Sequence, residues 1–176
     1  FTDTGVDLFC NAVKCISKKY PLESRPICFY ITGSGEAEKF YNLKNSIKNS
    51  NIKLVMAFDL NYKSFIEILQ KCHASLSLKL PHTKLALTTF PSKTIEIASY
   101  SLALISTIVS DIPEIFDENN AYLLPNPSPK CLMEAVCRCA EDVEELKKIS
   151  FSGNAIVQQR FSKTSVGNSL SSFLGL

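Results

Sequence analysis

Three segments of the chain combine the glycine, hydroxyl, ammonium and carboxylate groups with which proteins hold phosphates and sugars. The first is Thr32-Gly33-Ser34-Gly35-Glu36. Its two glycines allow the backbone to approach a ligand, and a helix that follows such a loop offers free N–H groups to an anion. The segment is neither a G-x-G-x-x-G motif nor a Walker loop, so by itself it favours an ordinary turn.

The second segment runs from residue 90 to residue 96. Proline and serine at positions 91 and 92 indicate the start of a helix, and Lys93 falls in its first turn, where a cation opposes the helix dipole. Glu96 lies about one turn further, so Ser92, Lys93 and Glu96 can project toward the same side and hold a phosphate and a sugar diol. The alternative is a Ser–Glu capping box with a solvated lysine, which the spacing alone favours.

The third segment, residues 107–114, contains Ser110, Asp111 and Glu114 and by itself indicates a polar connection. The two histidines, His73 and His82, are isolated in the sequence, which favours a structural or solvated role over that of a ligand. No pair of acidic residues has the spacing of a metal site, so we expect neither a metal nor another cofactor.

Helices and strands must position these segments, and the spacing of apolar residues along the chain alternates between the helical and the extended kind. Short, wholly apolar runs such as Ile27-Cys28-Phe29-Tyr30-Ile31 are typical of parallel strands covered on both faces. The pattern predicts an α/β fold, a Rossmann-like open parallel sheet with helices on both faces, in a single domain over residues 1–176. The predicted strands are 27–31, 52–58, 74–80, 102–106 and 121–124. The predicted helices are 4–19, 36–48, 62–72 and 93–100, a turn at 113–116, and a region from 130 with breaks near Gly153; an irregular loop is expected up to residue 91.

The composition of the chain excludes several classes of protein. The chain has 176 residues, 45% of them hydrophobic, and 20% charged with a formal net charge of +2. That length and balance support one domain with a real core and exclude a nucleic-acid binder that depends on a strong basic field. The seven cysteines lie in apolar runs without a C-x-x-C pair, which predicts free core thiols rather than disulfides. We find no leader sequence and no run of about 18 apolar residues, so a cytoplasmic protein is expected.

The order of these pieces adds a more specific signal. Residues 90–107, followed by Ser110-Asp-Ile-Pro-Glu-Ile-Phe, resemble the signature region of GT-B glycosyltransferases of the family-4-like type, glycosyltransferase group 1. That family has a P-S-K-x-x-E helix, a strand ending in a small polar residue, and a G-x-x-E-like turn. Residues 31–36 resemble its strand and glycine loop, and Gly5-Val6-Asp7 resembles its K-G-x-D segment. The similarity spans nearly the whole chain in register.

The resemblance implies the carboxyl-terminal, donor-binding half of a two-domain enzyme. Such an enzyme would transfer a sugar, with retention of configuration, from a UDP-, GDP- or ADP-sugar to a glycan, lipid or other acceptor, as hexosyltransferases do. The amino-terminal acceptor domain is a further expected partner, so the fragment alone is expected to be inactive. The strand that the family has before its K-G-x-D segment is expected to be missing from this chain. It implies no nucleic-acid partner and is compatible with contact between the intact protein and a membrane.

The resemblance also implies roles for particular residues. Lys93 would be catalytic, because it stabilises charge on the departing diphosphate. Glu96 would accept hydrogen bonds from the ribose hydroxyls, and the backbone near Phe58 and Asp59 would face the base. The donor-binding residues implied in this way are Gly33, Ser34, Gly35, Phe58, Asp59, Ser92, Lys93, Thr94 and Glu96.

Four positions depart from the family pattern. Thr88 replaces the first glutamate of an E-x7-E motif, and Thr4 replaces the basic residue before Gly5. Tyr100-Ser101 and Ser110 stand where glycines are common. These departures keep two alternatives open: a non-catalytic binding module on the same fold, and a GT-B-like sugar-nucleotide epimerase, which would need further acidic residues.

Overall fold

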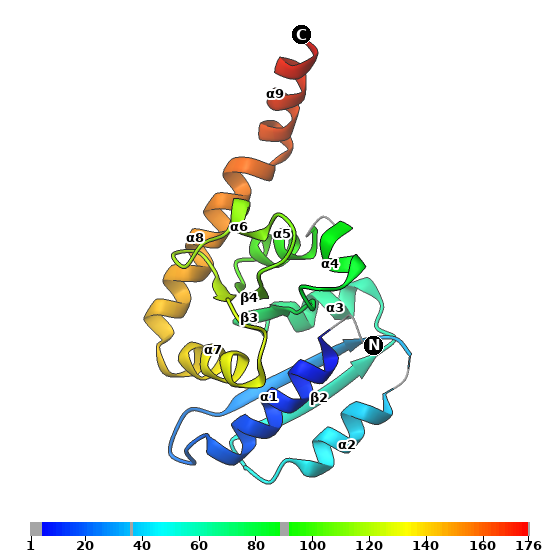
Figure 1. The fold of residues 1–176 in the computed structure, drawn as a ribbon, viewed down its shortest axis with the longest axis vertical. Coiled ribbons are helices and arrows are strands. Elements are labelled where there is room, and N and C mark those ends of the chain that lie inside the picture. Colours follow the sequence, from blue (N-terminus) through cyan, green and yellow to red (C-terminus); the bar gives the residue numbers. More distant parts are fainter. Residues whose placement is uncertain (1–4, 36, 89–91, 176) are drawn as a thin grey trace.

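The computed structural model describes residues 5–35, 37–88 and 92–175 of the chain. Helices and strands alternate through its first two thirds, and helices make up the rest (Figure 1). The strands are β1 (Ile27–Gly33), β2 (Ile52–Phe58), β3 (Ala74–Ser77), β4 (Ala103–Thr107) and β5 (Tyr122–Leu124). The helices are α1 (Val6–Lys19), α2 (Glu38–Ser46), α3 (Tyr62–Leu69), α4 (Lys84–Thr88), α5 (Ser92–Ser99), α6 (Ile112–Ile115), α7 (Pro129–Glu141), α8 (Val143–Phe161) and α9 (Lys163–Leu174).

Every strand pair is parallel, as the apolar runs predict. β1 pairs with β2 from Ile27 opposite Ile52 to Gly33 opposite Phe58. β4 lies between β3 and β5, with Ala74 opposite Ala103 and Ile105 opposite Tyr122. Parallel strands need crossover connections, and a helix follows each of the first four strands. The structure therefore confirms the α/β, Rossmann-like fold class.

The sheet consists of two hydrogen-bonded sections, β1–β2 and β3–β4–β5, and no ladder among the described residues joins β1 to β3. Gly5, at the start of α1, lies against Leu78 just beyond β3: a Cβ atom on Gly5 would be 2.6 Å from the Leu78 Cβ. Gly5 also has a φ of 66°, which favours glycine.

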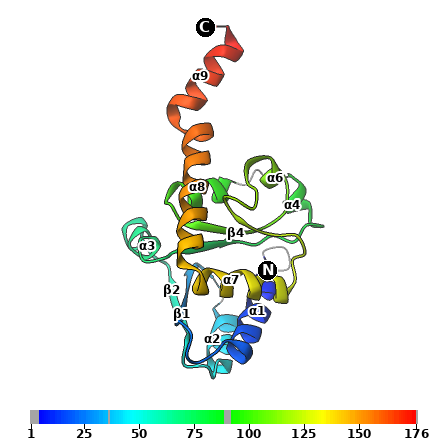
Figure 2. The ribbon, with the colours of Figure 1, turned by 90° about the vertical axis from the view of Figure 1, so that its left-hand side faces the viewer.

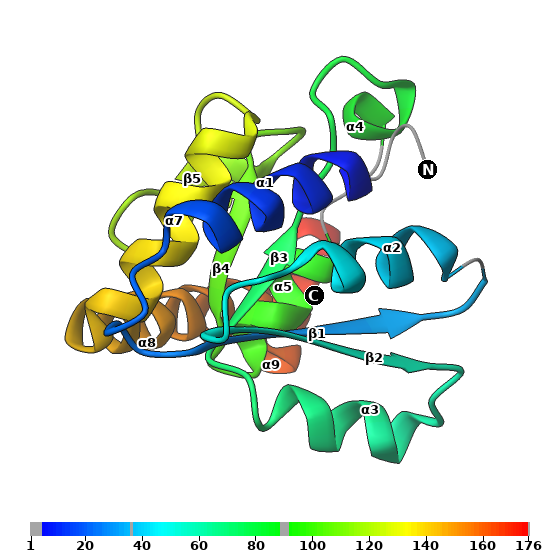
Figure 3. The same ribbon diagram turned by 90° about the horizontal axis from the view of Figure 1, so that it is seen from below.

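Two hydrophobic clusters lie on the two faces of β4, which is buried at every residue. Ala103 and Ile105 belong to the cluster that contains residues of α1 and α7, whereas Leu104 belongs to the cluster formed with α5, α6 and α8. Successive side chains of a strand point to opposite faces, so an apolar run with no polar alternation is what a strand between two cores needs. Figure 3 shows helices on both sides of the β1–β2 section, with α1 and α2 on one side and α3 next to β2 on the other.

Three predictions about local structure were wrong. The segment 84–88, expected within a loop, forms α4, and Gly153, expected at a break, lies inside α8. The helical region is interrupted at Asp142 and at Ser162 instead, and α9 projects beyond the body from Ser162 (Figure 2). β1 is not covered on both faces: Cys28 is exposed and most of its neighbours are half-buried, because β1 borders the division of the sheet.

The seven cysteines are all free thiols in the structure. Cys10 and Cys139 are buried in the core as predicted, whereas Cys28 is exposed. Burial raises the pKa of the Cys139 thiol to about 12 and that of Cys137 to about 11. Among the described residues, no helix is both long and apolar enough to cross a membrane.

Candidate functional site

The carboxyl ends of β1 and β2 meet at two predicted site residues. The backbone N–H of Asp59 donates to the Gly33 carbonyl over 2.9 Å, which ties the two strand ends together. Asp59 has a φ of 53° and Gly35 a φ of 100°, so both loops turn sharply where they leave the sheet. Gly33, Ser34 and Asp59 are exposed, and the Phe58 ring packs 6.3 Å from that of Phe40 on α2. Glu36 lies outside the described residues.

Two side-chain hydrogen bonds join the carboxyl ends of β3 and β4. The Thr107 hydroxyl oxygen accepts a hydrogen bond from the Lys79 backbone N–H at 2.9 Å, and the Ser106 hydroxyl donates to the Ser77 carbonyl at 3.1 Å. Both hydroxyl residues are fully buried, so these bonds form away from competing water. They hold the start of the loop that leads from β3 to α4. Sequence analysis gave these hydroxyls no role, although two polar residues at the end of an apolar strand are a usable signal.

α5 presents the second predicted segment to solvent. Ser92, Lys93 and Glu96 are exposed, whereas Thr94 is 1% exposed and packs beneath them. Ser92 is the first residue of α5, and Glu96 follows it by four residues. In a capping box the acidic residue stands three positions after the cap, whereas Glu96 stands four positions after Ser92. The capping box that the sequence analysis favoured is therefore disfavoured. Pro91 lies outside the described residues.

The departures from the family pattern have different structural consequences. Ser101 and Ser110 have φ values of 57° and 49°, so the left-handed backbone remains although the glycine is absent. Thr88 is exposed at the end of α4, and its hydroxyl donates to the Lys84 carbonyl at 2.8 Å, a local bond within the helix. Thr4 lies outside the described residues. Asp7 of the Gly5-Val6-Asp7 segment forms an ion pair with Lys39 of α2.

Sequence analysis missed a pair of tyrosines near these residues. The hydroxyl oxygens of Tyr62, at the start of α3, and Tyr100, directly after α5, are 3.3 Å apart. The hydrogen bond with Tyr62 and the negative charge of Glu96 both raise the pKa of Tyr100. The two tyrosines are 38 residues apart in the sequence, so no local pattern could have found the pair.

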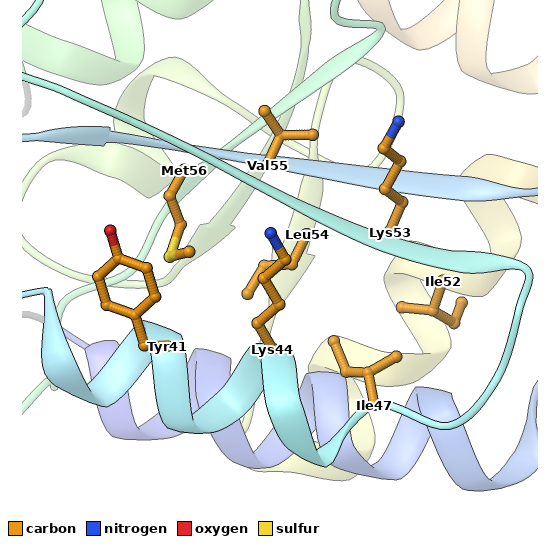
Figure 4. Close-up of a pocket in the computed structure, with 8 residues that line it drawn as sticks. All are labelled: Tyr41, Lys44, Ile47, Ile52, Lys53, Leu54, Val55 and Met56. Atoms are coloured by element: carbon orange, nitrogen blue, oxygen red, sulfur yellow. The ribbon is translucent and has the colours of Figure 1, made fainter.

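A hollow of about 500 Å³ lies elsewhere, between α2 and β2 (Figure 4). Ile52, Leu54 and Met56 face α2 there, while Lys53 points away from it. β2 pairs only with β1 among the described strands, so its other edge is open. A lysine on an edge strand is a common device against unwanted strand pairing. The hollow contains none of the predicted site residues, and we interpret it as the consequence of this open edge.

The histidine, cysteine and acidic side chains of the described residues are dispersed. The described residues contain no group of three or more His, Cys, Asp or Glu side chains placed to hold a metal ion. His73 and His82 are both exposed. The charged side chains predicted for the site are the Lys93 ammonium and the Glu96 carboxylate, both exposed on α5.

Comparison with known proteins gave one family and several structures. The family model described as glycosyl transferases group 1 matches residues 2–142. No curated protein sequence matches the chain.

Three of the similar solved structures show the extent of the likeness. Anabaena Alr3699/HepE in complex with UDP and glucose is 16% identical with a TM-score of 0.68, over 99% of this chain and 45% of that one. Sucrose-phosphate synthase from Thermosynechococcus elongatus is 12% identical with a TM-score of 0.73, over 99% and 42%. The carboxyl-terminal domain of the group 1 glycosyl transferase LpcC from Francisella tularensis is 17% identical with a TM-score of 0.70, over 93% and 82%. This chain spans less than half the length of the first two proteins.

Proposed function

The chain belongs to the group 1 glycosyl transferases, and we propose that it is the single, donor-binding domain of a retaining hexosyltransferase that uses a nucleotide sugar. One observation carries the proposal. α5 buries Thr94 and exposes Lys93 and Glu96 at the position where the family pattern has its donor-binding helix. Structures of the similar protein HepE contain UDP or UDP-glucose, which supports a nucleotide sugar as the donor.

The proposed mechanism is electrostatic. The departing diphosphate gains negative charge as the sugar–phosphate bond breaks, and a cation held nearby lowers the energy of that state. Lys93, on the exposed side of α5, supplies the cation, and the turned loop from Gly33 to Gly35 brings backbone close to the donor. Glu96 binds the ribose hydroxyls. The remaining implied contacts are Ser34, Phe58, Asp59 and Ser92, with Thr94 packed beneath the helix.

We place the acceptor-binding site in a part of the enzyme outside residues 1–176. In a two-domain transferase the reacting groups are positioned between the halves, and correct positioning accounts for a large share of the rate. We therefore expect no sugar transfer by the 176-residue chain alone. Robust transfer by this chain to a defined acceptor would contradict the proposal that transfer needs both domains, whereas slow hydrolysis of the donor would not.

Calorimetric titration of UDP, GDP and ADP tests the donor site. Lys93→Ala removes a charge-assisted contact worth roughly 1.5–3 kcal/mol, so the affinity should fall about ten- to a hundred-fold. Glu96→Gln should also weaken binding, because a neutral amide is a poorer acceptor than a carboxylate. Lys148→Ala, which removes an exposed lysine of α8, is the matched control and should bind like wild type. If both site variants bind like the control, the assignment is wrong.

The alternative proposal is a non-catalytic binding module on this fold. Thr88 favours it, since a threonine whose hydroxyl is bonded within α4 cannot provide the charge of the family glutamate. Transfer assays on the intact protein separate the two proposals. A module binds the nucleotide but transfers nothing, whereas a transferase with Lys93→Ala keeps its fold and loses turnover.

A further inference from the structure

Two large aromatic side chains lie exposed next to the proposed ribose contact. Tyr62 is 71% exposed and Tyr100 is 38% exposed, although their hydroxyl groups meet at 3.3 Å. A tyrosine ring placed in water forgoes much of the stabilisation that its burial would provide. The pair thus presents two flat apolar surfaces, fixed relative to each other by one hydrogen bond and available to a ligand.

The order of residues along α5 and in the turn directly after it matches the order of groups in a nucleotide. Lys93, Glu96 and Tyr100 are spaced by three and four residues, and a helix rises about 1.5 Å per residue. Residues at these spacings lie on neighbouring parts of one helix surface. The negative charge of Glu96 acts on Tyr100, which agrees with this placement. A nucleoside diphosphate that puts its phosphates at Lys93 and its ribose at Glu96 would have its base beside Tyr100.

Tyr62 reaches the same place from the other section of the sheet. It follows Asp59, the residue that turns at the end of β2 with its N–H bonded to Gly33. Asn61 caps α3 by accepting the Ser64 N–H at 2.9 Å, which fixes the direction of the helix from its first turn. Tyr62 therefore joins the strand ends that carry the glycine loop to the helix that carries Glu96.

We propose that the nucleobase of the donor stacks on the ring of Tyr62, which the Tyr100 hydroxyl holds in place. This inference rests on the proposed function and deepens it, because it assigns the base-binding surface of that site. Every base has a flat π-face that stacks on an aromatic side chain, so the contact would bind UDP, GDP and ADP without selecting among them. Tyr62 is the contacting residue, and Tyr100 is a positioning residue. The alternative is that the two tyrosines only link α3 to α5.

NMR titration of the labelled chain with UDP and with inorganic pyrophosphate tests the proposal. Tyr62→Ala should weaken UDP about 5- to 150-fold, the usual value of one stacked base, and leave pyrophosphate unchanged. Tyr62→Phe keeps the ring but loses the hydrogen bond to Tyr100, so it should weaken UDP less than Tyr62→Ala and about as much as Tyr100→Phe. Tyr62→Leu keeps apolar bulk without a π-face and should resemble Tyr62→Ala. Nuclear Overhauser contacts should join the uracil protons to the Tyr62 ring. Tyr41→Ala, at a 52% exposed tyrosine of α2, is the matched control.

The outcomes separate this inference from the proposed function. If UDP binding depends on Lys93 but Tyr62→Ala and the control bind equally, the stacking surface is wrong and the donor site stands. If Tyr62→Ala weakens UDP and pyrophosphate alike, the pair is a structural link and the inference is overturned. If the wild-type chain binds neither UDP nor pyrophosphate, the proposed function fails and this inference fails with it. Tyr100→Phe, which removes only the hydroxyl, should weaken UDP less than Tyr62→Ala.

Discussion

Gly153 provides a sharp test of how α8 packs. A Cβ atom at this buried position would lie 2.8 Å from the backbone oxygen of Asn120, closer than real Cβ atoms come to any neighbour. The Asn120 turn cannot readily yield. Its side chain accepts the Asp117 N–H at 3.0 Å and donates to the Asp117 carboxylate at 2.8 Å. Gly153→Ala must therefore displace α8 or break this turn.

Two opposing effects decide the magnitude. Alanine gains about 0.5–1 kcal/mol over glycine inside a helix, because it loses less backbone freedom on folding. Overpacking a close-packed site typically costs about 1–3 kcal/mol. The close atom at Gly153 is a backbone oxygen in a turn that two side-chain hydrogen bonds brace, which puts this site in the upper half of that range. We therefore expect Gly153→Ala to lower the free energy of unfolding by about 1–2.5 kcal/mol and the Tm by about 2–10 °C.

Gly167→Ala is the matched control, because Gly167 lies inside α9. Apart from its chain neighbours and the backbone of its own helix, no atom of the described residues lies within 4 Å of its Cβ position. That variant should show the helix-propensity gain alone, as an unchanged or higher free energy of unfolding and a stronger helical circular dichroism signal. Urea unfolding of the wild type and both variants measures the difference. A Gly153→Ala variant at least as stable as Gly167→Ala would refute the argument that close packing, rather than a helix break, requires glycine here.

Ser101→Gly and Ser110→Gly should each raise the free energy of unfolding by about 1 kcal/mol, since both serines occupy left-handed backbone that costs L-residues about that much; a loss on thermal unfolding would contradict this. Asn154→Ala should lower it by about 1–2 kcal/mol, because the side chain donates 3.0 Å hydrogen bonds to two carbonyls at the end of α5; an unchanged urea midpoint would exclude that contribution. Burial raises the pKa values of Cys137 and Cys139 to about 11 and about 12 from an ordinary 9.0, so the stability these thiols contribute is complete below pH 9 and is lost as pH rises to 12. Urea midpoints that stay constant from pH 8 to pH 11 would argue against this linkage. Mass spectrometry after unreduced, denaturing alkylation should count seven modified cysteines, and any bridged pair would overturn the free-thiol assignment.

The elements and their parallel arrangement could be predicted from the sequence by itself. The predicted strand 52–58 has the bounds of β2, and the apolar run 102–106 is β4 displaced by one residue. Both predictions follow from the pattern of apolar and polar side chains over a few residues, because that pattern reflects the period of the local backbone. The family signature in residues 90–116 is local in the same sense. It placed Ser101 and Ser110 at glycine positions, where the backbone is left-handed.

Only the tertiary structure decided which polar residues meet and which are buried. Lys93 and Thr94 are neighbours in the sequence, yet one is exposed and the other is in the core, because α8 and β4 pack on one side of α5. The pairing of Tyr62 with Tyr100 and the contact between Gly153 and Asn120 likewise join different elements. Local periodicity cannot encode such contacts. They depend on where the chain returns to the sheet after each crossover. They also depend on close packing, in which the opposite faces of one helix, or the space of one methyl group, separate a site residue from a core residue.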